Sequence, residues 1–195
     1  MTIALRQTWI GIRLVIFGTI VLGLIYPILV TGIGQVFASS AANGSLIKAA
    51  DGTVIGSSLI GQNFSEPQWF HSRPSAAGAD GYDAQSSGAS NLGPNNDDLL
   101  EAVEERKAAV IAEDGPGDIP ADALTASGSG LDPHISSAYA DRQIARVARE
   151  NSLTPAEVAE LVADHTEGRM LGFIGEPRVN VVELNLAISL ASRRD

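Results

Sequence analysis

Residues 14–37 form one apolar segment, LVIFGTIVLGLIYPILVTGIGQVF, which contains no Asp, Glu, Lys or Arg. A helix needs roughly 20 apolar residues to cross the hydrocarbon core of a bilayer, so this segment is long enough. A charged side chain at its centre would cost on the order of 3 kcal/mol. We therefore predict a single transmembrane helix over residues 14–37.

This segment has two other interpretations. The apolar region of a cleaved signal peptide usually has about 7–15 residues, fewer than are present here. Val36-Phe37-Ala38 nevertheless resembles a small-residue cleavage site, so cleavage stays an alternative. A buried helix of a soluble core is the second alternative, and it is disfavoured because the segment is uniformly apolar.

The flanking cations predict how the helix is oriented. Arg6 and Arg13 precede it, and the next positive residue is Lys48. Because cytoplasmic flanks carry the excess of Lys and Arg, residues 1–13 should be cytoplasmic and the chain beyond residue 38 extracytoplasmic. Within the helix, Tyr26-Pro27 should cause a bend, since proline removes a backbone hydrogen bond.

The rest of the chain has room for one domain. Residues 38–45 (ASSAANGS) are small and polar and are interpreted as a linker, which leaves residues 46–195 for a compact extracytoplasmic domain. The sequence has no cysteine, so no disulfide supports this domain. Beyond the helix there are 11 basic and 23 acidic residues, a formal charge of 11 − 23 = −12. This balance argues against binding to nucleic acid or to an anionic membrane surface.

The first part of the domain combines two short strands with a long loop. Strands are predicted near residues 45–48 and 53–56, joined by an Asp51-Gly52 turn. Residues 62–96 lack periodicity and are rich in Gly, Ser, Asn and Pro, yet they contain a cluster of aromatic residues. Low aromatic content marks disorder, so we interpret this stretch as an ordered loop that packs its aromatic side chains and presents polar groups to a partner.

Helical patterns dominate the remainder. A helix is expected from Asp97 to about Glu113, with an apolar side made of Leu99, Leu100, Val103, Val110 and Ile111, followed by an exposed connector over residues 113–123. Asp132 is interpreted as the N-cap of a helix that has Pro133 at its first position and reaches Glu150. Thr154-Pro155-Ala156-Glu157 forms a capping box, and Thr166-Glu167-Gly168 should end that helix.

A short apolar strand or loop over residues 170–174 and a last helix that opens at Asn180 complete the pattern. The strands are short and the helices outnumber them. The predicted fold class is therefore a single N-terminal transmembrane helix plus a small mixed α/β (α+β) extracytoplasmic domain.

No catalytic constellation is evident. The sequence has no GxxxxGK[ST] loop, zinc-ligand spacing, HExxH motif or TVGYG-like filter. Ser129, Asp132 and His134 bring nucleophile and base types together, but a GxSxG elbow would require glycine at Ser127. Glu66, His71, Arg73, Asp80 and Asp83 could line a polar pocket, although nothing in the spacing sets its geometry.

One membrane helix cannot form a transport path by itself, so the pattern favours an accessory subunit with two Gly/Ser-rich loops as its contact surfaces. The candidate residues of a partner interface are Phe64, Trp69, Phe70, His71, Arg73, Tyr82, Asn91, Ser127, Ser129, Asp132 and His134. No catalytic, metal-binding or cofactor-binding residue is assigned. An anchored exported binding module acting alone, and an anchored hydrolase using Ser129 and His134, remain as alternatives.

Several longer strings in the same order resemble the C chain of the bacterial potassium-transporting ATPase, the Kdp system. They are Tyr26-Pro27, NGSLI at residues 43–47, SLIGQNF at 58–64, FHSRPS at 70–75, SSGASNL at 86–92, TASGSGLDPHIS at 125–136 and GFIGEPRVNVVELN at 172–185. Ser72 stands where glycine is frequent in the family, and the 113–123 connector looks variable.

The resemblance implies a subunit of a pump in the bacterial inner (plasma) membrane that imports potassium at the expense of ATP. In that family a channel-like A chain holds the ion path, a P-type ATPase B chain hydrolyses ATP with Mg, and a small F chain is associated. The C chain is needed for assembly and is described as a catalytic chaperone that raises the ATP affinity of the B chain.

The predicted topology constrains that last role. A domain outside the cell cannot touch ATP inside it, so any effect on ATP affinity must pass through the membrane helices. Such coupling is typically worth about 1–3 kcal/mol and is reciprocal. We therefore expect the C chain to be an outer cap on the ion entrance of the A chain, held by the loops at residues 64–91 and 127–134.

Overall fold

A computed structural model describes residues 2–49 and 52–193 of the chain. The structure divides into two compact units, Met1–Leu46 and Ile47–Asp195. Asp51 of the predicted strand-joining turn lies outside the described residues.

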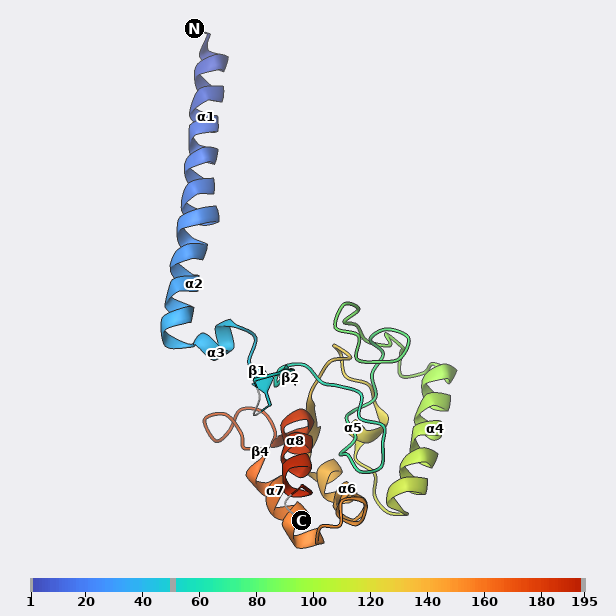
Figure 1. The fold of residues 1–195 in the computed structure, drawn as a ribbon. Helices are drawn as coiled ribbons and strands as arrows, with labels where there is room; N and C mark the ends of the chain where they lie inside the picture. Colours follow the sequence, from blue (N-terminus) through green and yellow to red (C-terminus); the bar gives the residue numbers. More distant parts are fainter. Residues whose placement is uncertain (1, 50–51, 194–195) are drawn as a thin grey trace. The chain divides into compact units, whose positions relative to one another are not determined.

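The first unit is dominated by one continuous helix, Ile3–Phe37, which is long and apolar enough to cross a membrane. It consists of α1 (Ile3–Ile20), a π-helical turn η1 (Val21–Ile25) and α2 (Tyr26–Phe37) (Figure 1). The helix therefore begins at Ile3 rather than at residue 14, and it includes both N-terminal arginines. Its backbone irregularity is the π turn that precedes Pro27, where a missing N–H removes one hydrogen bond of the regular ladder. A four-residue helix α3 (Ser39–Ala42) lies in the segment interpreted as a linker.

The second unit is an α+β domain, as predicted, with two small sheets. Strands β1 (Leu46–Lys48) and β2 (Val54–Ser57) pair with each other. The second sheet is antiparallel in the order β3 (His134–Ser136), β5 (Arg178–Asn180), β4 (Thr166–Glu167). Its helices are α4 (Asp97–Asp114), α5 (Ala121–Leu124), α6 (Ser137–Glu150), α7 (Pro155–Asp164) and α8 (Val181–Ala191).

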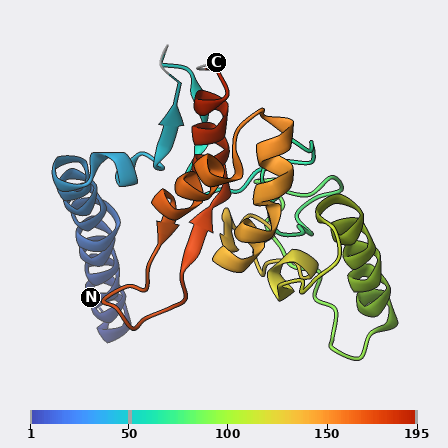
Figure 2. The ribbon, with the colours of Figure 1, turned by 90° about the horizontal axis from the view of Figure 1, so that it is seen from below.

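The core lies among α6, α7, α8 and the three-stranded sheet. Figure 2 shows α7 and α8 side by side, and the two helices are in contact. Val158, Leu184 and Ile188 are fully buried there. The long loop contributes Phe70, which is also fully buried, while Phe64 and Trp69 pack against the same cluster. The prediction of an ordered loop that packs its aromatic residues is confirmed.

Local signals located some helix starts correctly. The capping box at α7 is complete, because the Glu157 N–H donates to Thr154 Oγ1 (3.2 Å) and the Thr154 N–H donates to Glu157 Oε2 (2.8 Å). Asn180 caps α8 as expected, since its Oδ1 accepts from the Val182 and Glu183 N–H groups.

The predicted start of the helix before α7, which is α6, was wrong. Residues His134–Ser136 form strand β3, which pairs with β5, and the N-cap of α6 is Ser136, whose Oγ accepts from the Tyr139 N–H (3.1 Å). The Asp132 carboxylate instead accepts from the His134 N–H (3.0 Å). Pairing with β5, in which Val179 lies opposite Ile135 and 44 positions after it, overrides the local cap signal.

Two further expectations need correction. The 113–123 connector is not simply exposed, because it contains α5 and its Ala123 is buried. In α4 only Val110 of the expected apolar side is buried, and Leu100 and Ile111 are exposed. The helix α7 ends directly before Thr166-Glu167-Gly168, as predicted, and Thr166–Glu167 then pairs with β5 as strand β4.

Candidate functional site

The two Gly/Ser-rich segments bind each other. Residues 62–96 and 127–134, called the paired loops below, are joined by several short hydrogen bonds. Ser75 Oγ donates to the Gly130 carbonyl (2.6 Å), and the Gly88 N–H donates to the Ser129 carbonyl (2.9 Å). Ser87 Oγ donates to the same Ser129 oxygen (3.0 Å). The polar groups of these loops therefore satisfy one another, so the pair behaves as one structural unit.

Gly130 sits where the paired loops approach most closely. Its φ is +65°, in the left-handed region that favours glycine. A Cβ at this position would lie 2.7 Å from Ala77 Cβ and 2.7 Å from the Gly88 carbonyl oxygen. A side chain here would force the loops apart.

An ionic group joins the paired loops at their inner end. Arg73 Nη1 lies 3.3 Å from Asp132 Oδ2, and His134 Nδ1 lies 3.1 Å from Asp132 Oδ1. Partial burial raises the pKa of Asp132, but the hydrogen bonds from His134 and the charge of Arg73 outweigh it and lower the pKa below its ordinary value. The carboxylate therefore stays ionised at neutral pH and holds both partners.

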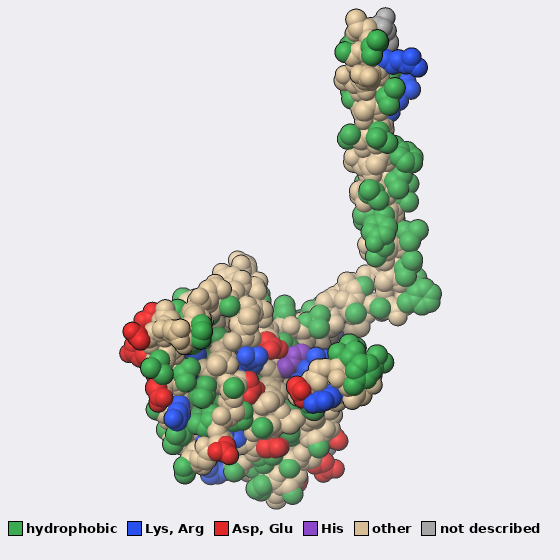
Figure 3. All heavy atoms as spheres, turned by 180° about the vertical axis from the view of Figure 1, so that it is seen from behind, with side chains coloured by type: hydrophobic (Ala, Val, Ile, Leu, Met, Phe, Trp, Pro, Cys, Tyr) green, Lys and Arg blue, Asp and Glu red, His purple; other side chains and the backbone are tan. Residues whose placement is uncertain are grey.

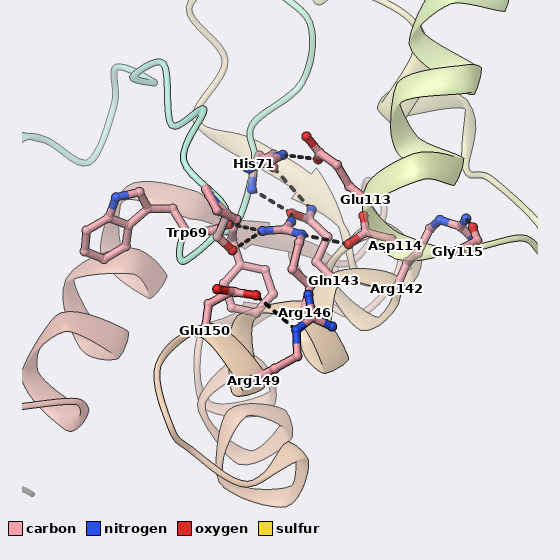
Figure 4. Close-up of polar contacts among 12 residues, drawn as sticks. Trp69, His71, Glu113, Asp114, Gly115, Arg142, Gln143, Arg146, Arg149 and Glu150 are labelled. Carbon is pink, nitrogen blue, oxygen red and sulfur yellow. Dashed lines mark hydrogen bonds and ion pairs between the residues drawn. The ribbon is translucent and has the colours of Figure 1, made fainter.

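A buried polar cluster fixes the aromatic segment of the long loop (Figure 4). Arg146 Nε pairs with Asp114 Oδ1 at 2.8 Å, and the two side chains are 3% and 2% exposed. Arg146 Nη1 also donates to the carbonyls of Pro67 (2.6 Å) and Trp69 (2.8 Å). Asn185 forms a reciprocal pair with the backbone of Phe70, at 2.8 and 2.9 Å. Side chains thus supply the backbone partners that a neighbouring strand would otherwise provide.

His71 lies at the edge of this cluster, close to Glu113 (Figure 4). The backbone N–H of His71 donates to Gln143 Oε1 (2.7 Å), and the imidazole Nδ1 lies 3.1 Å from Glu113 Oε2. Burial and then the charge of Arg146 lower the pKa of His71 below its ordinary value of 6.5, against the opposing effect of Glu113. The imidazole is therefore neutral at pH 7.

The candidate interface residues differ widely in exposure. Phe70 and Ser127 are buried inside the domain, and only Asn91 and Ser129 are exposed. The half-buried residues are Phe64, Trp69, His71, Arg73, Tyr82, Asp132 and His134. The Tyr82 hydroxyl donates to the Arg73 carbonyl at 2.8 Å. Most of these side chains are therefore at least partly buried within the domain, where they stabilise the conformation of the paired loops.

The polar pocket considered from the sequence is formed in part. A cavity of about 330 Å³ is lined by His71, Arg73 and Asp80 together with Tyr82 and Arg106. Glu66 contributes only its carbonyl to His71, and the Asp83 carboxylate accepts from the Gln85 N–H. Ser129 Oγ accepts from the Leu131 N–H, while His134 is engaged with Asp132. Among residues 2–49 and 52–193, no group of three or more His, Cys, Asp or Glu could hold a metal ion.

One surface was not anticipated from the sequence. Residues 170–174, called the apolar loop below, project between β4 and β5, and their large side chains (Met170, Leu171, Phe173 and Ile174) are 44% to 78% exposed. Figure 3 shows hydrophobic side chains gathered on a protruding part of the second unit. Reciprocal 2.9 Å backbone bonds between Met170 and Ile174 close the turn. Exposed apolar patches of this kind mark interaction sites.

The ion pairs Arg169–Glu176 (2.6 Å) and Arg178–Glu167 (2.7 Å) hold the base of the apolar loop. Such exposed pairs contribute little stability, but they shape a neutral base under an apolar tip. The sequence signal that could have indicated exposure is the pair Gly172 and Gly175, both with positive φ, which turn the apolar run back on itself.

Comparisons with known proteins agree with the resemblance seen in the sequence. Residues 8–189 match the family model described as KdpC, K⁺-transporting ATPase, c chain. The chain is 56% identical over 194 residues to the potassium-transporting ATPase KdpC subunit of Kineococcus radiotolerans, covering 98% of this chain and 97% of the relative. It is 52% identical over 176 residues to the subunit of that name from Koribacter versatilis, with 90% of each chain covered. The Mycobacterium tuberculosis subunit is 49% identical over 186 residues, covering 94% of this chain and 97% of the relative.

Proposed function

The chain belongs to the family of K⁺-transporting ATPase c chains, and from this premise we propose that its second unit supports transporter assembly from the extracytoplasmic side of the membrane. As a member of that family it has an accessory role in potassium import and is not the catalytic chain. The observation that carries the proposal is the match over residues 8–189, which spans the candidate membrane helix and nearly all of the second unit.

The proposed orientation rests on charge. Arg6 and Arg13 precede the uninterrupted apolar segment 14–37, and the next cation along the chain is Lys48. Because cytoplasmic flanks carry the excess of Lys and Arg, this distribution favours an N-terminus in the cytoplasm of a bacterium and a second unit outside its inner membrane.

Because the chain lacks cysteine, two single-cysteine variants can test the orientation. Thr2→Cys and Ala159→Cys introduce thiols at exposed positions of the two units. A membrane-impermeant maleimide should label residue 159 in intact spheroplasts and residue 2 only after permeabilisation. Labelling with the opposite preference would reject an extracytoplasmic second unit, and the cysteine-free chain is the control.

The proposed partners are the A, B and F chains of the pump. We assign the contact with them to the exposed edge of the paired loops, which includes Asn91 and Ser129, and to the apolar loop. An apolar tip on a neutral base suits an apolar surface of another chain, and its exposure in the isolated subunit leaves it open to such a partner.

Co-purification from mild detergent tests these contacts. Leu171→Ser with Phe173→Ser, and separately Asn91→Ala with Ser129→Ala, should lower recovery of the complex at least fivefold. Leu100→Ser is the matched control, because Leu100 is an exposed apolar residue on α4. Recovery equal to that of the control would reject these surfaces, and a stable lone monomer would favour a binding module acting alone.

The catalytic-chaperone role is proposed as indirect. An extracytoplasmic domain does not contact the ATP and Mg used by the pump, so it would raise the ATP affinity of the B chain through coupled movements of membrane helices. A coupling of about 1–3 kcal/mol corresponds to roughly a 5- to 150-fold change in affinity and must be reciprocal. ATP should then lower the equilibrium dissociation constant of this subunit by the same factor. A dissociation constant that is insensitive to ATP, alongside a subunit-dependent ATP affinity, would overturn the indirect route.

A further inference from the structure

A groove of about 440 Å³ runs along one side of α8 and is separate from the paired loops' ionic group. Small-molecule sites have volumes of roughly 300–1,000 Å³, and the volume of this groove lies within that range. Its walls come from β1, β2, the start of the long loop and α8. The groove, called the α8 groove below, is lined by Lys48, Ala49, Ile55, Gln62, Phe64, Trp69, Val182, Asn185, Leu186, Ser189, Leu190 and Arg193.

The interior of the α8 groove offers an apolar surface. Half-buried Phe64 and Trp69 meet at a centroid distance of 6.3 Å, and Leu186 adds an aliphatic side chain to the same lining. The amides along the groove are already engaged. Gln62 Nε2 donates to the Ile55 carbonyl (3.2 Å), and Asn185 is occupied by the backbone of Phe70. An occupant of this interior would therefore be recognised by apolar contact.

Two cations border the same groove. Lys48 and Arg193 are exposed, and no carboxylate of the described residues lies within 4.0 Å of either ammonium or guanidinium group. Elsewhere in the second unit, cations such as Arg73, Arg146 and Arg178 do have carboxylate partners. In a domain with a formal charge of −12, this pair of cations at an apolar groove favours an anionic head on the occupant.

We propose that the α8 groove binds one acyl chain of an anionic membrane phospholipid, with Lys48 and Arg193 holding its phosphate. Lys48 follows the end of the candidate span by eleven residues, which is at most roughly 40 Å of extended chain. Membrane lipid is therefore the amphiphile most available to this groove. The net charge still opposes attachment to an anionic surface as a whole, so the site takes a single lipid. This binding is independent of the partner contacts proposed above.

Trp69 provides a direct reporter, since the chain has only two tryptophans and the other is Trp9 in the membrane helix. The full chain carrying Trp9→Phe is placed in nanodiscs that contain brominated phosphatidylglycerol or brominated phosphatidylcholine at equal mole fraction. Bromine quenches indole emission on contact. Saturable quenching by the phosphatidylglycerol and little by the phosphatidylcholine is the expected result.

Three variants separate the groove from general membrane contact. Lys48→Gln with Arg193→Gln should raise the half-saturating lipid fraction at least tenfold, whereas Arg149→Gln with Arg178→Gln removes equal charge elsewhere and should change it less than twofold. Ser189→Phe fills the groove without changing charge and should abolish quenching while circular dichroism stays unchanged.

Equal quenching by both lipids, or quenching that survives Ser189→Phe, would overturn the proposal. The proposal would also be overturned if another chain of the complex protected Trp69 from quenching by brominated lipid, because a protein segment would then occupy the groove. If the Lys48/Arg193 variant fails to fold, the lipid preference and the Ser189→Phe result decide the question.

Discussion

Replacing Arg146 by methionine should strongly destabilise the second unit. The change removes four hydrogen bonds, to Asp114, Gln143 and the carbonyls of Pro67 and Trp69. It also leaves the Asp114 carboxylate, 2% exposed, without its cation. Breaking a buried ion pair by removing one partner costs about 3–5 kcal/mol. At about 2–4 °C per kcal/mol for a domain of this size, Tm should fall by roughly 6–20 °C.

Thermal unfolding followed by circular dichroism on the full chain measures this loss. Arg149→Met is a matched control, because Arg149 lies one turn further along α6 and its side chain is 66% exposed in a pair with Glu150. Such a surface pair is worth about 0–1 kcal/mol, so Tm should move by only a few degrees at most.

A second substitution tests the cause. Asp114→Asn in the Arg146→Met background removes the unpaired charge and should recover at least about 1 kcal/mol of the loss. If Arg146→Met costs less than about 1 kcal/mol, or if Asp114→Asn adds to the loss instead of reducing it, the argument that a buried ion pair fixes the 67–71 backbone is refuted.

Three other substitutions test separate parts of the fold. Gly130→Ala should lower Tm by several degrees, because it combines a left-handed backbone with a clash against Ala77, whereas Gly128→Ala meets nothing within 4 Å and should be nearly neutral. Asn180→Ala should cost about 2–3 kcal/mol in the same unfolding assay, since it removes the cap of α8 and leaves the Ser58 carbonyl without its donor, and Asn180→Asp should cost less because it keeps the cap. Because the pKa of His71 is lowered in the folded state, the stability that its neutral form contributes to the fold is fully present above pH 6.5. This stability is lost as pH falls through the folded-state pKa. Stability measured between pH 8 and pH 5 should therefore decline on the acid side, and His71→Gln should flatten that decline. An identical pH profile in the variant would contradict this assignment.

The features that could be predicted were those encoded over a few neighbouring residues. Uniform apolarity over residues 14–37 indicated a membrane helix, and the spacing of Thr154 and Glu157 placed the start of α7. The family motifs are also contiguous strings, and they alone pointed to the K⁺-transporting ATPase c chains. The helix itself begins at Ile3, upstream of the predicted span, because helix formation continues through Arg6 and Arg13, where the uninterrupted apolar run has not yet begun.

The candidate site was harder to predict, because residue type alone does not say what a side chain faces. Phe70 and Ser127 were grouped with exposed residues of a partner interface, yet the structure buries both. The apolar run at 170–174 was predicted only as a short strand or loop, and the sequence did not indicate that its large side chains are exposed. For Phe70 the deciding contact comes from a distant part of the chain, since its backbone pairs with Asn185, 115 positions away.

By itself, the sequence determined the candidate membrane span, the α+β class, the caps of α7 and α8 and the family, since each depends on adjacent residues or on contiguous motifs. Only the tertiary structure decided that the Gly/Ser-rich segments bind each other, that Ser136 and not Asp132 caps α6, and that an apolar groove with two cations lies beside α8. The physical reason is that burial and pairing are properties of two surfaces brought together by the fold, and neither surface carries the identity of its partner in its own residues.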